Sequence, residues 1–440
     1  MARLERCASA CLRCGHSAAI GVCVKLAPRF LLPLVFLAAL ALLTAMYLFG
    51  AEPQLRAFLG IYLVHFDLPP FGDAYGITSA MACERQGIET YLGNPCHYKP
   101  VGFVYPPIWK LLSLLPIDGS WTMAFALTFI AAFTAALSFV PLGESRRGRV
   151  LAVLAVLSPA SLMAADYGNN DMLIFALVVG AIAALGNSGR GKALGYGLIM
   201  FAGLLKYFPF AALGWAGAAR PRHIMLVGAV LTAVLIAFVA LAGDQLPLSL
   251  ASMVTMSAGS YVFGIRNLPI MLSEMGLAGP GGALTLRLVL TFAVLTVAWR
   301  RSARYASLDL PAAIPEVQWR FLIIGSLVVI GAYLGNQNLD YRMIFLLLVL
   351  PGLDALRRVP GERFGQMAVV AVALMYVFPA RMQIEGWFLP GSNGLFLASV
   401  ADIVIREALW FALVATLLAL VFAHLRSGPL WQGIMAARAA

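Results

Sequence analysis

The sequence contains little charge. Only 12% of its 440 residues are Asp, Glu, Lys or Arg, whereas 61% are hydrophobic and the mean hydropathy is +0.87. A soluble domain needs more polar groups than this to cover its surface. Apolar runs of about 20 residues, the length that crosses a bilayer, recur from Phe30 to near the C-terminus. We therefore expect an all-α polytopic membrane protein without a separate soluble domain.

Acidic residues are scarcer than basic ones. The chain has 20 Asp and Glu against 31 Lys and Arg, a formal net charge of +11. Such an excess can indicate nucleic-acid binding, but here the basic residues form short clusters between apolar runs rather than one basic surface. Retention of positive residues on the cytoplasmic side explains the excess more simply. We expect contact with membrane lipids and none with nucleic acid.

Several catalytic motifs are also absent. No HExxH, P-loop or nucleophile elbow occurs, which excludes the common zinc-protease, nucleotide-hydrolase and serine-hydrolase signatures. One CxxC, Cys11 to Cys14, could bind zinc with His16, but a reduced cytoplasmic tail is the favoured interpretation because no second pair accompanies it. We expect no metal and no cofactor. In the first large loop, Cys83 and Cys96 fit either a disulfide or two free thiols.

The distribution of basic residues predicts the topology. Five of them precede the run at residues 30–50, so residues 1–29 are expected to form a basic cytoplasmic tail followed by an uncleaved first span. Alternation along the chain then gives about 12 spans in one domain, residues 30–425, with a cytoplasmic tail at 426–440. Residues 51–120 form the first extracytoplasmic loop. The other apolar runs are 121–141, 150–165, 171–187, 193–218, 224–242, 283–300, 318–336, 341–358, 364–380 and 404–425.

Two segments do not fit a single span. The run 103–117, "FVYPPIWKLLSLLPI", is short, contains Lys110 and has prolines near both ends, so we expect a re-entrant or interfacial helix. The run 193–218 has basic residues at both ends and "LLKYFPF" in its middle. Two short helices that meet at residues 206–209 satisfy the charge rule, and such helices occur only where protein or water lines them.

Ionisable residues that inner-face anchoring does not explain converge on the expected outer ends of the spans. Charged groups near membrane depth are costly and are therefore functional candidates. One polar outer cavity beneath the first loop would bring them together. These residues are Asp67, Asp73, Asp166, Asp171, Lys206, Arg266, Asp340 and Arg342.

The order of several short motifs resembles the GT-C superfamily of membrane glycosyltransferases and, within it, glycosyltransferase family 87. The first loop, "FGDAYGITSAMACERQGIETYLGN", and the following "FVYPPIWKLLSLLP" are similar to the family's acidic loop start and its aromatic-Tyr-Pro-Pro helix. "DYGNNDMLIFAL" is similar to its Gly-Gln-x-Asn segment, with Asn169 in place of Gln. "LLKYFPF" resembles its Lys-x-x-Pro element, and "RNLPIML" and "DYRMIFLLLVLP" fit later positions more loosely. The resemblance covers most of residues 30–360.

This resemblance implies a GT-C type bundle with a long first extracytoplasmic loop and an inverting sugar transfer. The donor would be a polyprenyl-phosphate sugar, with mannose as the family default, and the acceptor a lipid or glycan at the outer face of the plasma (inner) membrane. A carboxylate in the first loop would take the proton from the attacking hydroxyl, an assistance of about 10²- to 10⁴-fold. The phosphate leaving group needs contact with cations rather than a strong acid.

Two aspartates compete for the role of base. Asp73 opens a helical-looking segment, where an N-cap carboxylate would be oriented by the helix N-terminus, and we predict that it is the catalytic base. A capping role alone is the alternative. Asp67 precedes "LPP" and is interpreted as a turn residue, and the nearby His65 as a packed or interfacial side chain.

Three cations are candidates to bind the donor phosphate. Lys206 would act as a point charge and Arg342 as a bidentate fork, while Arg266 is a weaker candidate. The alternatives are a snorkelling side chain for Lys206, an ion pair with Asp340 for Arg342 and simple solvation for Arg266.

Four further residues are predicted to bind the sugar or the acceptor: Tyr75, Tyr105, Asn169 and Asp171. Capping of the helix that starts at residue 171 is an equally good interpretation of the last two.

Two other functions fit the composition. A transporter or lipid flippase would use the outer charges as a substrate gate, and a non-catalytic scaffold would serve in envelope assembly. The long first loop ahead of the Tyr-Pro-Pro segment favours the enzyme. Transport would be favoured by a charge pair buried at the midplane between repeated halves, and no repeat is visible in the sequence.

Overall fold

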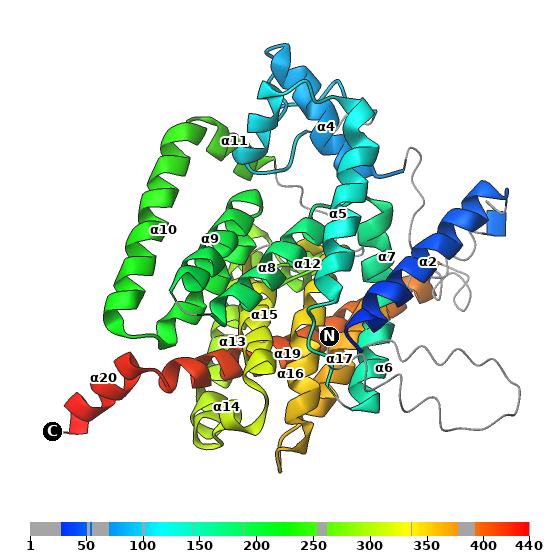
Figure 1. Cartoon of the computed structure of the whole chain (residues 1–440). Helices are drawn as coiled ribbons and strands as arrows, with labels where there is room; N and C mark the ends of the chain where they lie inside the picture. Colours follow the sequence, from blue (N-terminus) through cyan, green and yellow to red (C-terminus); the bar gives the residue numbers. More distant parts are fainter. Residues whose placement is uncertain are drawn as a thin grey trace, which may run out of the picture.

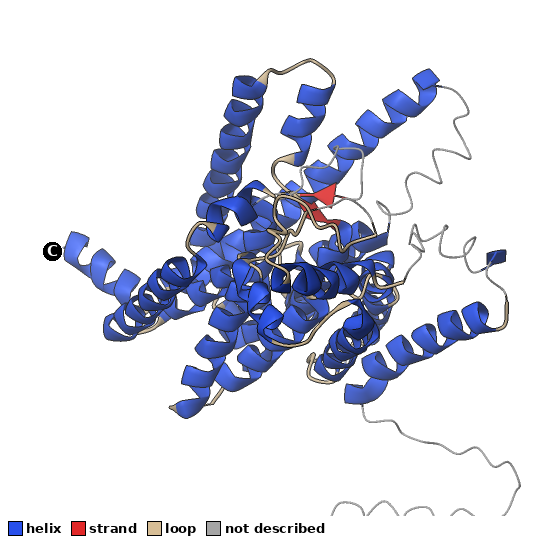
Figure 2. Ribbon diagram, turned by 90° about the horizontal axis from the view of Figure 1, so that it is seen from above, coloured by secondary structure: helices blue, strands red, loops and turns tan. Residues whose placement is uncertain are grey.

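The computed structural model describes residues 28–50, 53–54, 70–98, 102–143, 145–187, 189–252, 262–335, 337–376 and 392–439. Within these ranges the chain is almost entirely helical (Figure 1), and one short antiparallel pair, β1 (Val262–Phe263) with β2 (Asn338–Leu339), lies over the middle of the bundle (Figure 2). This confirms the predicted all-α class. The helices are η1 Pro28–Phe30, α2 Leu31–Leu48, α4 Gly72–Arg85, η2 Pro107–Leu114, η3 Gly119–Trp121, α5 Thr122–Leu137, α6 Arg146–Val156, α7 Pro159–Asp166, α8 Asp171–Leu185, α9 Arg190–Leu205, η4 Phe208–Ala218, α10 Pro221–Ala242, α11 Gln245–Ala251, α12 Asn267–Glu274, α13 Pro280–Ser307, α14 Leu310–Ala313, α15 Glu316–Gly335, η5 Asp340–Phe345, α16 Leu346–Ala355, η6 Leu356–Arg358, α17 Phe364–Tyr376, α19 Ser392–Arg426 and α20 Pro429–Ala439.

Seven of the described helices are long and apolar enough to cross a membrane, which indicates a multi-pass membrane protein. Three shorter apolar helices, Asp171–Leu185, Phe208–Ala218 and Phe364–Tyr376, accompany them. The predicted total of about 12 spans stays a prediction. The expected tail at 426–440 contains α20, so its chain is mostly helical rather than irregular.

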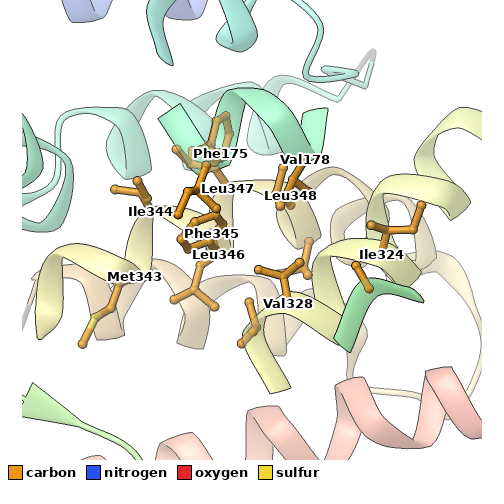
Figure 3. Close-up of a cluster of buried hydrophobic side chains, with 14 of the residues drawn as sticks. Phe175, Val178, Ile324, Val328, Met343, Ile344, Phe345, Leu346, Leu347 and Leu348 are labelled. Carbon is orange, nitrogen blue, oxygen red and sulfur yellow. The ribbon is translucent and has the colours of Figure 1, made fainter. Parts of the chain in front are cut away.

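The core forms around α15. In its apolar 18-residue stretch, 78% of the residues are buried. Figure 3 shows how side chains of α8, including Phe175, pack with Ile324 and Val328 of α15 and with the run 343–348. By contrast, only 6% of the corresponding stretch is buried in α10 and only 11% in α13. A helix that exposes apolar side chains along most of its length suits contact with acyl chains.

The chain breaks where the sequence predicts it. Helix α9 ends at Leu205, η4 begins at Phe208, and Lys206 between them has an extended backbone with φ −156° and ψ 125°. Pro209 has no N–H to donate, so it is tolerated in the first turn of η4 and would disrupt a continuous helix. The predicted pair of short helices is therefore confirmed, and the ammonium group of Lys206 lies at the junction.

The first loop is tied together by several contacts. A disulfide joins Cys83 at the end of α4 to Cys96, so the first of the two alternatives for these thiols is confirmed. Lys110 bridges α4 and the following loop, with its Nζ 2.7 Å from Glu84 Oε1 and 2.6 Å from Glu89 Oε1. The helix expected over 103–117 is shorter, a 3₁₀ helix over Pro107–Leu114, because prolines and the buried Lys110 ion pairs do not support a longer apolar helix.

We predict that this disulfide stabilises the first loop. Closing a loop of about 15 residues stabilises a fold by about 3 kcal/mol, so the Cys83→Ser variant should melt at a lower temperature than the wild type in detergent. Cys7→Ser, which alters a cysteine outside the loop, is the control. Equal melting temperatures for Cys83→Ser and the wild type would contradict the prediction.

Candidate active site

The turn between α7 and α8 forms the base of the site. Asn169 N donates to Ala164 O at 2.9 Å and Gly168 N to Ala165 O at 3.0 Å, a pair of bonds typical of a helix that ends with a left-handed residue. Gly168 supplies that residue, with φ +56°. A Cβ at this position would lie 2.8 Å from Ala126 Cβ and 3.1 Å from Phe71 Cβ. Glycine is therefore required both for the backbone conformation and for the close approach of α4.

Helix α4 begins on this turn through backbone hydrogen bonds. Phe71 N donates to Asp166 O and Asp73 N to Tyr167 O, both at 3.0 Å. The N-cap position belongs to Phe71, whose φ of +65° is uncommon for a residue with a side chain. The expectation that Asp73 is the N-cap is therefore wrong, because the helix starts earlier than the sequence suggests. Asp73 still lies in the first turn, where the helix dipole favours a carboxylate.

A fully buried carboxylate joins two cations from distant parts of the chain. Asp171 Oδ1 lies 2.9 Å from Lys206 Nζ, and Asp171 Oδ2 lies 3.2 Å from Arg342 Nε. Buried charges persist only when they are paired. The N-cap of α8 is Asn170, so Asp171 is an ion-pair partner in the first turn rather than a cap. The position of Lys206 is explained by this pair rather than by snorkelling. Arg342, for which a pair with Asp340 was one expectation, forms its ion pair with Asp171.

Asn169 links this pair to Asp73. Its Oδ1 accepts from Asp171 N at 2.7 Å and from Lys206 Nζ at 3.4 Å. These two donors fix the orientation of the amide, because an Asn oxygen accepts and its nitrogen donates. Nδ2 consequently points to Asp73 and donates to its Oδ2. Asp73, Asn169, Lys206, Asp171 and Arg342 thus form one continuous polar cluster.

The position of Asp73 perturbs its acidity. Burial raises the pKa of Asp73 above its ordinary value, since it disfavours the charged form, while the Asn169 hydrogen bond and the charge of Lys206 only partly offset this effect. A carboxylate with a raised pKa is a stronger base once it is ionised. This property suits a general base for a hydroxyl group.

A cavity of about 660 Å³ opens beside the cluster. Lys206, Arg266 and Arg342 all line it, so the structure brings the three predicted cations to one space. The lining residues, all within the part of the chain that the structure describes, include no Asp or Glu. Its apolar wall contains Pro106, Phe208, Ala211, Leu250 and Val262. Such a cavity suits a phosphate that carries an apolar chain.

The predicted tyrosines have different positions. Tyr105 is buried, and its ring centroid lies 5.7 Å from Lys206 Nζ, so it is part of the site. Tyr75 lies elsewhere: its hydroxyl donates to Cys96 O at 3.2 Å and its ring packs against His97 and Tyr98. Residues two apart on a helix point in opposite directions, which explains why Tyr75 does not follow Asp73. Among the residues that the structure describes, no contact groups Tyr75 with the cluster.

Asp67 and His65 lie outside the described residues, so the predictions for them are not tested.

Some residues of the site were not predicted. Asn338 accepts a hydrogen bond from Arg342 Nη1. Asn338, Gln337 and Tyr341 line the cavity. The amides of "GNQNLDYR" in an expected outer segment were the available signal for the first two.

The comparisons with known proteins agree with the predicted resemblance. The model of glycosyltransferase family 87 matches residues 103–315, just under half of the chain, so the chain resembles this family as its motifs predicted. The match includes five of the predicted site residues: Tyr105, Asn169, Asp171, Lys206 and Arg266. Asp73 of α4 and Arg342 of η5 lie outside it. No curated protein and no solved structure matches the chain.

We predict that Asp171→Asn destabilises the protein strongly. It leaves the buried Lys206 and the partly buried Arg342 without their carboxylate, and breaking a buried ion pair typically costs about 3–5 kcal/mol. Adding Lys206→Met should restore part of the lost stability, because one of the two cations is removed. Thermal unfolding in detergent measures both effects, with Asp118→Asn, at a partly exposed aspartate outside the cluster, as control. Additive losses in the double variant would show that the two side chains are not coupled.

Proposed function

We propose that this protein transfers a sugar, with mannose as the default, from a polyprenyl-phosphate donor to a hydroxyl group of a lipid or glycan acceptor at the outer face of the plasma membrane. The family match indicates glycosyltransferase activity, and with it a sugar donor and an acceptor. One observation carries the finer proposal. A first-loop carboxylate is connected through Asn169 to a lysine that lines a cavity with two arginines.

The cations account for the donor side. As the bond between the anomeric carbon and the phosphate oxygen breaks, negative charge grows on the leaving phosphate. Lys206 and Arg342 are already held in place by Asp171, so they do not have to reorganise when this charge develops. Arg266 adds a third positive charge to the cavity. The apolar wall beside them would accept the first isoprene units of the donor.

Asp73 accounts for the acceptor side. The acceptor oxygen attacks the anomeric carbon from the face opposite the phosphate, its proton passes to Asp73, and polyprenyl phosphate leaves. The stereochemistry is inverted because a single displacement occurs. Asn169 separates Asp73 from the cations, an arrangement that suits groups acting on opposite faces of the same sugar. Its hydrogen bond also holds the carboxylate in one orientation.

We predict that Asp73→Asn abolishes transfer. The amide cannot accept the hydroxyl proton, so the rate should fall by about 10²- to 10⁴-fold. Purified protein is incubated with radiolabelled polyprenyl-phosphate hexoses and membrane extract as the acceptor source, and Asp118→Asn serves as the matched control. Full activity in Asp73→Asn, or no transfer by the wild type with any donor, would contradict the proposal and favour a transporter or flippase.

The pH dependence of the reaction should report Asp73. A base must be ionised, so kcat/KM should fall as the pH drops through its pKa, and the raised pKa places this fall above the ordinary range for an aspartate. Removing the hydrogen bond in Asn169→Ala removes an interaction that lowers this pKa. The fall should therefore move to higher pH in this variant. A shift to lower pH, or no shift, would contradict the assignment.

A further inference from the structure

A second cavity of about 580 Å³ lies at the other end of η4. Its walls include Trp215 near the end of η4 and the first residues of α10. Helix α10 has the length and composition of a membrane span and leads to α11, whose Leu250 lines the first cavity (Figure 1). The two cavities therefore lie toward opposite faces of the membrane. The charge rule predicts that the second one faces the cytoplasm.

This second cavity is strongly basic. Lys192, Arg220 and Arg222 line it together with His223 and His424, and its lining within the described ranges contains no carboxylate. Helices α9, α10 and α20 all begin here. A positive side chain at a helix N-terminus opposes the helix dipole, so helix stability does not account for these residues. An anion would be attracted both by the side chains and by the helix ends.

His424 adds a hydrogen-bond donor that has no acceptor. Trp319 Nε1 donates to His424 Nδ1 at 3.4 Å, which leaves the proton of the neutral ring on Nε2. Nε2 is buried and has no hydrogen-bond partner among the described residues. The ring is held in place by stacking on Trp215, with centroids 4.5 Å apart. A buried donor without an acceptor is unfavourable, and a bound anion would supply the acceptor.

The surroundings of this cavity are apolar. Helix α10 continues from it with Met225 67% exposed and Leu226 60% exposed, and α20 exposes Leu430 and Ile434. A ligand with its charge in the cavity would have acyl-chain contacts available on both helices. Cytoplasmic anchoring explains the sign of the charges, but it does not explain why cations from two helices converge on one cavity.

We propose that this cavity binds the phosphate ester headgroup of an anionic membrane lipid. Lys192, Arg220 and Arg222 contact the phosphate oxygens, and the acyl chains lie along α10. The double variant Arg220→Ala/Arg222→Ala removes two arginines from the lining of the cavity. The double variant Arg300→Ala/Arg301→Ala removes two exposed arginines of α13 that do not line the cavity. The second pair is a control of the same charge on the same expected face.

Native mass spectrometry of the full chain in detergent tests the proposal, with phosphatidylglycerol and phosphatidylcholine titrated separately. The wild type should prefer phosphatidylglycerol, and the Arg220/Arg222 variant should bind it at least about tenfold more weakly, since each basic residue near a lipid surface contributes about 1 kcal/mol. The control should change by less than about twofold, because Arg300 and Arg301 do not line the cavity and would not contact a headgroup bound there. Lys192→Gln gives a second reading if the double variant does not fold.

Three results would overturn the proposal. Equal binding of the two lipids would show that the net negative charge of the headgroup is not recognised. Equal loss in the Arg300/Arg301 control would show that only general surface charge matters. Saturable binding of inorganic phosphate alone, with the same dependence on Arg220 and Arg222 and with displacement of the lipid, would show that the ligand is free phosphate. None of these readings depends on sugar transfer.

Discussion

The buried carboxylate of Asp171 is the constraint on which the site depends. It stands between Lys206 and Arg342, two cations that enter from separate segments of the chain. An uncompensated charge at this depth would be strongly unfavourable, so α8, the junction of α9 with η4, and η5 must remain together. The same pairing leaves both cations facing the cavity and places Lys206 where it orients Asn169. The geometry of the polar cluster and the packing of these elements thus both depend on one group.

Much of the fold could be predicted because membrane spans obey simple rules of length and charge. The break near Lys206 followed from basic residues at both ends of one apolar run, and the structure has it there. The convergence of Lys206, Arg266 and Arg342 on one space followed from the cost of charge in hydrocarbon.

The remaining details depend on local geometry that the sequence does not show. A difference of two residues in the start of α4 gives the N-cap to Phe71 instead of Asp73 and turns Tyr75 away from the cluster. The link through Asn169 depends on a left-handed glycine and on the contact of α4 with α5 and the α7–α8 turn. Partners such as Asn338 become visible only when distant segments meet.

The two cavities lie at opposite ends of η4. The first lies beside a polar cluster that contains the carboxylates of Asp73 and Asp171, which suits the proposed chemistry on a lipid-linked sugar. The second is lined by cations without a neighbouring carboxylate among its lining residues, which suits the proposed binding of an anion. Helix α10 runs between them with most of its surface exposed, so both proposed lipid ligands would contact the same side of the protein. This arrangement would let the membrane support the enzyme at one face and supply its substrate at the other.

The most direct test of the account is a structure with a non-transferable phosphonate analogue of a polyprenyl-phosphate sugar. We expect the phosphonate oxygens to contact Lys206, Arg342 and Arg266, with the anomeric carbon turned toward the carboxylate of Asp73. A phosphonate bound away from these cations, or a sugar with Asp73 on the same face as the phosphonate, would contradict the central claim.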